Sequence, residues 1–176
     1  DLSALRTTIK SGSITQRQTA ENALRAAILQ ARTIFQTDIA KSCHHGSSDF
    51  TSEFMDALNP IATIISSGDE EPHCHPRPDT LGTIGKYSRG SRSLIFSTEL
   101  SRSTPEFLQR SKNKNSATTR PIDKERLVTV YGMINVRTDG ERIIIAQKLE
   151  TPSNRGSWDI QEILWNQTLN DFEYQF

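Results

Sequence analysis

The sequence lacks several features that would assign it to a class at once. Its 176 residues contain no run of 18 or more apolar residues, so the pattern predicts a soluble chain without a membrane-spanning helix. Basic and acidic side chains number 21 each, and this balance gives no global charge to favour nucleic acid or a membrane surface as a partner. A glycine-rich phosphate loop, a nucleophile elbow and a metalloprotease helix motif are all absent.

Cysteine is scarce, and both copies stand among the four histidines, in the segments CHH at 43–45 and HCH at 73–75. Two cysteines are too few for a disulfide framework but enough for one bridge between Cys43 and Cys74. In the chain-entropy model a closed loop of about thirty residues stabilises by about 3 to 4 kcal/mol. The bridge would indicate a secreted protein, whereas free thiols would indicate the nucleus or the cytoplasm.

The same cluster allows two other interpretations. Thiolate and imidazole are preferred zinc ligands, so a closed site could form from the set Cys43, His45, His73 and Cys74. Adjacent ligands have diverging side chains, however, and we predict neither a metal nor another cofactor. In an enzyme, a histidine could act as general base, an acidic residue could orient it, and an arginine could bind an anion. The candidates for these roles are His45, His73, His75, Arg77 and Asp79.

Helical periodicity dominates the first part of the chain. Ser13 and Gln16 match a capping box, and apolar residues recur at helical spacing between residues 20 and 35. This pattern predicts a long amphipathic helix that runs from Ser13 to about Lys41. The helical part as a whole is expected at about 13–67.

Shorter segments follow. Helical spacing continues over residues 50–58, and Asn59-Pro60 resembles a helix start that leads into an apolar turn at 61–65. Three prolines in 69–82 predict a rigid exposed loop. Leu94-Ile95-Phe96 predicts a short strand.

The segment from Arg126 to Glu150 alternates apolar and polar residues around Asp139-Gly140, which predicts a β-hairpin with a two-residue turn. Gly132 in mid-strand predicts a bulge or bend. The register implied by this turn gives one nearly aliphatic face. Its pairs are Val136 with Ile143, Ile134 with Ile145, Gly132 with Gln147, and Val130 with Leu149.

The remaining segments complete the predicted sheet. A short helix is expected near 104–110, a flexible loop at 111–122, and a further strand at 158–165, where strand and helix patterns compete. Helices come first and strands later, so we predict a single α+β domain over 1–176. Its N-terminal helices would pack on a curved, mainly antiparallel sheet formed by about 82–176.

The last third of the chain resembles the NTF2-like superfamily, through a glycine in mid-strand, a glutamine in the next strand and a tryptophan opening the last one. The positions that carry the resemblance are Gly132, Val136, Gln147, Trp158, Ile160 and Trp165. It implies helices packed as a cone against a bent antiparallel sheet, and pairing through the open sheet face. The family includes transport-factor subunits, mRNA-export partners and small enzymes. The first half departs from the family, since it has no tryptophan-asparagine-glycine turn and residues 42–80 have no counterpart.

Two functions follow as hypotheses. The first is a non-enzymatic interaction domain that binds a protein partner, or a second copy of itself, through its sheet face. The residues expected on that face are Tyr131, Met133, Trp158 and Trp165. The alternative is a small secreted enzyme, a nuclease or other hydrolase, that works from the histidine loops. The basic run at 110–124 supports only weak nucleic-acid contact, because it contains no aromatic side chain for stacking.

Overall fold

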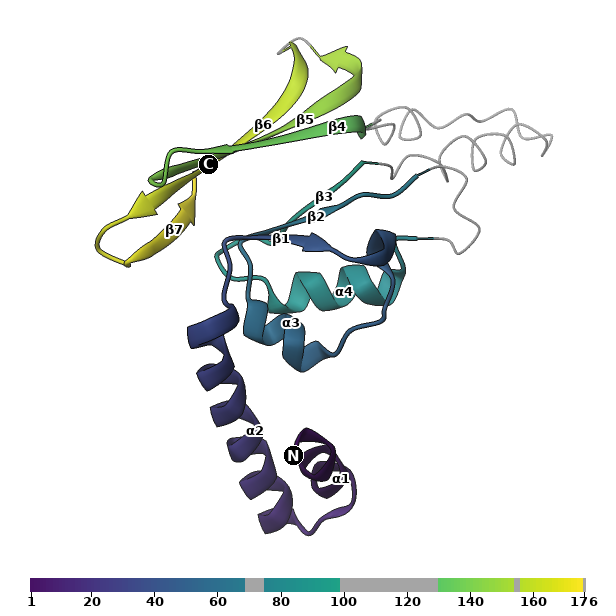
Figure 1. Cartoon of the computed structure of the whole chain (residues 1–176), viewed down its shortest axis with the longest axis vertical. Helices are drawn as coiled ribbons and strands as arrows, with labels where there is room; N and C mark the ends of the chain where they lie inside the picture. Colours follow the sequence, from purple (N-terminus) through teal and green to yellow (C-terminus); the bar gives the residue numbers. More distant parts are fainter. Residues whose placement is uncertain (69–74, 99–129, 154–155, 176) are drawn as a thin grey trace, which may run out of the picture.

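The computed structural model describes residues 1–68, 75–98, 130–153 and 156–175. These residues form a layer of helices, a parallel sheet of three strands and an antiparallel sheet of four strands (Figure 1). The predicted α+β class is confirmed, with N-terminal helices preceding the sheets. Among the described helices, none is long and apolar enough to cross a membrane.

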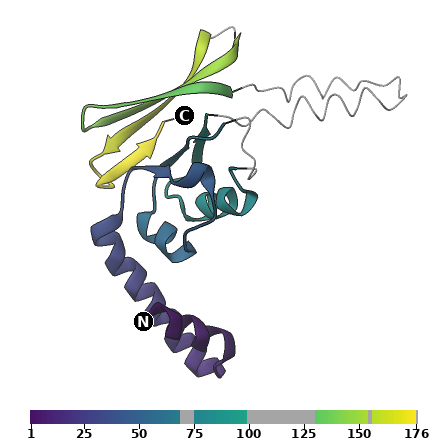
Figure 2. The same ribbon diagram turned by 45° about the vertical axis from the view of Figure 1, so that its right-hand side comes forward.

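Two N-terminal helices form a hairpin that projects away from the sheets in both views (Figures 1 and 2). They are α1 (Leu2–Ser11) and α2 (Ile14–Phe35), and Ser13 caps α2 through the predicted capping box with Gln16. The prediction that this helix continues to Lys41 is wrong. The chain leaves the helix at Gln36 because the residues after it join a sheet.

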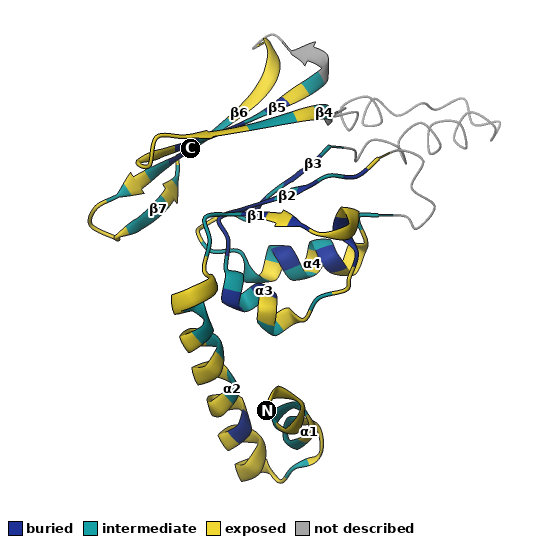
Figure 3. Cartoon of the chain, in the orientation of Figure 1, coloured by how far each residue is buried: buried dark blue, intermediate teal, exposed yellow. Residues whose placement is uncertain are grey.

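Polar contacts attach this helical hairpin to α3 (Ser52–Leu58). Arg6 donates from Nε to Glu53 Oε1 over 2.8 Å, and this bond holds the pKa of the Glu53 carboxyl at about 2. Further along, Arg32 Nε donates to the carbonyl oxygen of Asp56 over 2.9 Å. Apart from Ala20, no residue of α2 is buried, as the exposed colouring of Figure 3 shows.

The first sheet is entirely parallel, in the order β1-β2-β3. Its strands are β1 (Ile39–Ser42), β2 (Ala62–Ile65) and β3 (Leu94–Ser97). A single 3₁₀ turn, η1 (His44–Gly46), and α3 connect β1 to β2, and α4 (Pro78–Tyr87) lies between β2 and β3. The strand expected at 94–96 is confirmed. Because these three strands are parallel, the expectation of a mainly antiparallel sheet holds only for the second sheet.

Two local predictions for this region are wrong. Asn59 ends α3 in the left-handed conformation, at φ 40°, instead of starting a new helix. Residues 62–65 form the buried strand β2, because a short apolar run fits a central parallel strand as well as it fits a helical turn. The proline-rich loop is also shorter than expected, since Pro78 occupies the first position of α4.

The second sheet is antiparallel, in the order β4-β5-β6-β7. Its strands are β4 (Val130–Thr138), β5 (Arg142–Ser153), β6 (Gly156–Asn166) and β7 (Asp171–Tyr174). The predicted hairpin and the strand at 158–165 are confirmed, whereas β7 was not foreseen. The predicted helix at 104–110 and loop at 111–122 lie outside the described residues.

The hairpin register differs from the predicted one by two residues at its tip. Val136 pairs with Ile145 instead of Ile143, and Ile134 pairs with Gln147, so the predicted pairs Ile134 with Ile145 and Gly132 with Gln147 are wrong as well. The cause is the carboxylate at position 139, which accepts from the two backbone N–H groups at 141 and 142 and moves the turn one residue onward. A shift of two keeps every side chain on its predicted face.

A bulge restores the predicted register further along the hairpin. The register changes between Val130 and Ile134, and Gly132 lies there at φ 89°, which confirms the predicted bulge. Beyond the bulge, Val130 pairs with Leu149 as expected.

The two sheets share one apolar core. Ala62 of β2, Leu94 of β3 and the β5 residues Ile143 and Ile145 are buried together with Ile163 of β6. A second, smaller cluster on the other face of the parallel sheet joins α3 and α4 to that sheet. The parallel sheet is therefore covered on both faces, and its central strand β2 is almost entirely buried (Figure 3).

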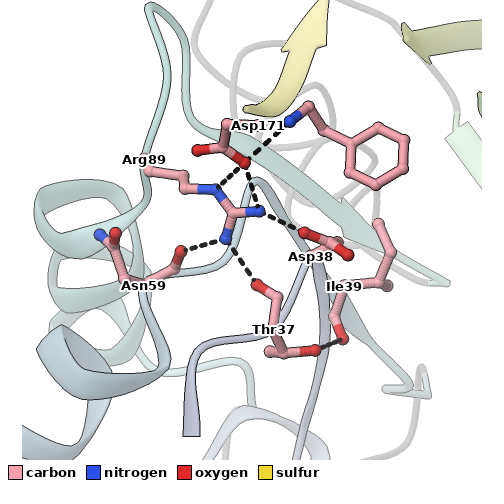
Figure 4. A network of polar contacts seen from close by, with 7 residues as sticks. Thr37, Asp38, Ile39, Asn59, Arg89 and Asp171 are labelled. Carbon is pink, nitrogen blue, oxygen red and sulfur yellow. Dashed lines mark hydrogen bonds and ion pairs between the residues drawn. The ribbon is translucent and has the colours of Figure 1, made fainter. Parts of the chain in front are cut away.

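Arg89 joins the parallel sheet to the last strand (Figure 4). Its side chain is only 10% exposed, and its Nη1 donates to the carbonyl oxygens of Thr37 and Asn59, each over 2.9 Å. Its Nε donates to Asp171 over 3.1 Å, and its Nη2 is paired with Asp38. One guanidinium thus satisfies carbonyls before β1 and β2 and a carboxylate at the start of β7.

We expect Arg89→Ala to lower the free energy of unfolding by about 2 to 3 kcal/mol, because two carbonyls lose a charged donor and two neighbouring carboxylates lose their cation. Urea denaturation measures this change. Arg92→Ala is the control, because this guanidinium is exposed and, among the described residues, makes a cation–π contact alone, 5.7 Å from the Tyr174 ring centroid. The control loss should stay below about 1 kcal/mol, and equal losses in both variants would contradict the structural role of Arg89.

Candidate functional site

The loops that follow β1 and β2 meet at the carboxyl edge of the parallel sheet. An open cavity of about 440 Å³ lies there. Its lining consists of His44, His45, Ser47, Ser48, Asp49, His75 and Arg77. In open α/β sheets ligands bind outside the carboxyl ends of the strands, so this cavity is the natural candidate site.

The backbone after β1 is folded so that it can meet the segment that precedes α4. His44, His45 and Gly46 all have positive φ, at 47°, 55° and 89°. A Cβ on Gly46 would lie 2.6 Å from Cβ of Pro76, and the Gly46 carbonyl accepts from Arg77 N over 3.0 Å. Strained conformations in non-glycine residues concentrate at functional sites, and here two consecutive histidines have them.

His44 and Asp49 form an oriented pair. Nδ1 of His44 lies 3.5 Å from Oδ2 of Asp49. Ser47 fixes that carboxylate, because its hydroxyl donates to Oδ2 over 2.6 Å and accepts from the Asp49 N–H over 3.2 Å. The Ser47 hydrogen bond lowers the pKa of Asp49, and nearby His44 and His75 lower it further. Asp49 is therefore a stable anion beside an imidazole.

His45 is oriented by a different acceptor. Its Nδ1 lies 2.6 Å from the carbonyl oxygen of Ser66, immediately after β2. A carbonyl oxygen can only accept, so Nδ1 carries the proton and Nε2 of the neutral ring keeps its lone pair. His45 is thus set up either to take a proton or to bind a cation through Nε2.

The predicted catalytic candidates are brought together only in part. His45, His75 and Arg77 line the same cavity, as the enzyme hypothesis requires. Asp79 does not line it, but its Oδ1 accepts from Arg77 Nε over 3.3 Å, so it orients the arginine. His73 lies outside the described residues.

The cysteine hypotheses are not decided. Cys43 is exposed and is not among the residues that line the cavity. Cys74 and His73 lie outside the described residues, so the Cys43–Cys74 bridge and the four-ligand zinc set both stay predictions. Within the described ranges, no group of three or more histidine, cysteine, aspartate or glutamate side chains is arranged to hold a metal ion.

Sequence reasoning missed the polar partners of the histidines. His44 was noticed only as part of the cluster, and Ser47, Ser48 and Asp49 were not singled out. Polar residues that follow a parallel strand are candidates for a site, and these three follow β1. The sequence did not reveal this, because β1 was assigned to the end of the long helix.

The residues expected at the sheet face do not share one surface. Trp158 pairs with Lys148 and Trp165 with Phe172, and their separation by seven residues in one strand places the two tryptophans on opposite faces. Trp165 makes an edge contact with Phe172, at 5.2 Å between ring centroids. Met133 is 57% exposed, and the side chain of Tyr131 is outside the described part.

Comparison with known proteins adds no relative. No family model, curated protein or solved structure matches the chain. The NTF2-like resemblance therefore stays a prediction, and the function has to be argued from the site itself.

We expect Gly46→Ala to cost at least about 2 kcal/mol of stability and to disorder the cavity, because the new Cβ meets Pro76 and the backbone needs positive φ. Thermal unfolding measures the loss. Gly82→Ala in α4 is the matched control, since its Cβ meets no atom within 4 Å. That variant should be neutral or gain up to about 1 kcal/mol from helix propensity.

Proposed function

We propose that the cavity at the carboxyl edge of the parallel sheet is the active site of a hydrolase that acts on anionic esters, phosphodiesters above all. One observation supports this most strongly: three histidines from segments about thirty residues apart line one cavity together with Asp49 and Arg77. Structural histidines in loops have no reason to converge, whereas acid–base catalysis needs two proton-transfer groups close together.

The two leading histidines suit opposite roles. Nε2 of His45 has a lone pair and is the general base that takes the proton of the attacking water. His44, whose Nδ1 lies beside the Asp49 carboxylate, is the general acid for the leaving oxygen. The bond between the water oxygen and phosphorus forms while the water proton passes to His45. The bond from phosphorus to the leaving oxygen breaks, and that oxygen receives a proton from His44. Arg77 binds the non-bridging oxygens, for which a planar guanidinium is well suited.

The test is hydrolysis of bis(p-nitrophenyl) phosphate, measured by release of nitrophenolate. We expect His45→Gln to lower kcat by about 10²- to 10⁴-fold, the usual range for a proton-transfer group. His44→Gln should lower kcat much less with this substrate, because nitrophenolate departs without a proton, and should show its full effect with a dialkyl phosphate. Arg77→Gln should raise KM, and Arg137→Gln on the remote hairpin should leave both constants unchanged. Each assay is run with EDTA and with added Zn²⁺, so that a metal-assisted reaction is recognised. Absence of hydrolysis under all these conditions would sink the proposal.

A second candidate function rests on the outer face of the antiparallel sheet. The cross-strand pairs Ile144–Glu162, Ala146–Ile160 and Lys148–Trp158 point away from the shared core, and Ile160 is 61% exposed. No described helix covers this face (Figure 1). We propose that it pairs with a second copy of the chain, because Arg142 and Glu162 provide both signs of charge for a twofold interface.

Light scattering after size exclusion tests this pairing. Ile160→Lys should convert a dimer into a monomer, since a charge at the centre of an apolar interface stays buried without a partner. Ile34→Lys is the control, because it changes an equally apolar residue that is 74% exposed on α2. A parent protein that is monomeric at all concentrations would exclude the interface.

A further inference from the structure

We propose that Gln147 and Thr98 are positioning residues for His45: they hold the carbonyl that fixes the proton of its imidazole on Nδ1. This inference rests on the proposed function for its catalytic meaning, but its structural content can be tested alone. The two residues belong to neither histidine loop. They act through the carboxyl end of β2.

The first link is the Ser66 carbonyl, which accepts from His45 Nδ1 over 2.6 Å. This oxygen belongs to a residue beyond the last paired residue of β2, so the ladder of the sheet does not hold it. If it moved, His45 would lose the acceptor that selects its tautomer. The position of this carbonyl therefore decides which ring nitrogen has the lone pair.

The second link is a clamp on the next residue, Ser67. Thr98 Oγ1 accepts from Ser67 N over 3.0 Å and donates to the Ser67 carbonyl over 2.6 Å. The Ser67 hydroxyl also lies 2.8 Å from the hydroxyl of Ser97 in a buried contact. One threonine hydroxyl thus replaces two ladder hydrogen bonds at the point where the strand pairing ends.

The third link connects this clamp to the second sheet. Gln147 of β5 donates from Nε2 to the Ser97 carbonyl over 2.6 Å, and Gly132 N donates to the Thr98 carbonyl over 2.9 Å. The antiparallel sheet therefore holds the end of β3, and the end of β3 holds the end of β2. Through these contacts the β4–β5 hairpin helps to hold the Ser66 carbonyl, which keeps the His45 proton on Nδ1.

Gln147 is an unusual residue for its place. It is 5% exposed and follows Ile143 and Ile145 along the same buried face. An amide in such an aliphatic row costs about 1 to 3 kcal/mol unless it is paired, so an apolar side chain would have served the core as well. Its hydrogen bond to the Ser97 carbonyl offsets the cost of burying the amide and fixes the end of β3.

The experiment measures the ring of His45 directly. Protein labelled with ¹⁵N in the histidine side chains is examined by long-range ¹H–¹⁵N NMR at a pH where the ring is neutral, and His45→Gln assigns the signal. The parent should show His45 protonated at Nδ1. Thr98→Val and Gln147→Met should shift the population toward protonation at Nε2, and Thr98→Ser should restore the parent spectrum because it keeps the hydroxyl.

The control is Gln161→Met, which removes an amide of the same sheet, in β6, that accepts from the Tyr174 hydroxyl. It should leave the His45 signals unchanged even if it lowers stability, which urea denaturation reports separately. Parent protein with Nε2 protonated, or His45 signals that are identical in parent, Thr98→Val and Gln147→Met, would overturn the proposal.

The outcome is independent of whether the chain is a hydrolase. If hydrolysis is found, the two disruptive variants should lower kcat and leave KM close to the parent value, because substrate binding depends on Arg77. If no hydrolysis is found but the tautomer shifts as expected, the proposed function fails and the positioning role stands.

Discussion

The arrangement of the two sheets depends most on the hydrogen bonds that the guanidinium of Arg89 donates. This guanidinium contacts the segments before β1 and β2 and the start of β7 at the same time. The parallel sheet and the antiparallel sheet therefore share a single cation, which links the start of β7 to the segments that lead into β1 and β2. Since the histidine loops leave the opposite edge of the same parallel strands, their separation depends on strand positions that Arg89 helps to fix.

The candidate site combines order with strain. Positive φ at two histidines would be costly in an isolated loop, and here close backbone contact with residues 76 and 77 offsets it. Asp49 and the Ser66 carbonyl then give the two neighbouring imidazoles different hydrogen-bond partners. Nδ1 of His44 lies beside a carboxylate, whereas Nδ1 of His45 lies beside a neutral carbonyl oxygen that selects its tautomer.

The sequence predicted the antiparallel half of the fold better than the parallel half. Alternation on one face and Gly132 were enough to place the hairpin and its bulge, because half-buried strands have a period of two. Strands β1 and β2 have no such period, since both of their faces are covered, and they were read as helix. The site was recognised only as a histidine cluster, because the contact between residues 46 and 76 has no local signature. Asp49 and Ser66 could be found only once the parallel strands were known.

The ion pair between Arg89 and Asp171 also has a consequence for the order of folding, because it joins residues 82 positions apart. During synthesis the three parallel strands, α3 and α4 can assemble well before β7 has been made. Until then the guanidinium can reach Asp38 and the two backbone carbonyls but not Asp171, its second anionic partner. A ribosome-bound chain should therefore already present the histidine loops while remaining more easily unfolded than the finished protein, and completion of β7 closes the network last.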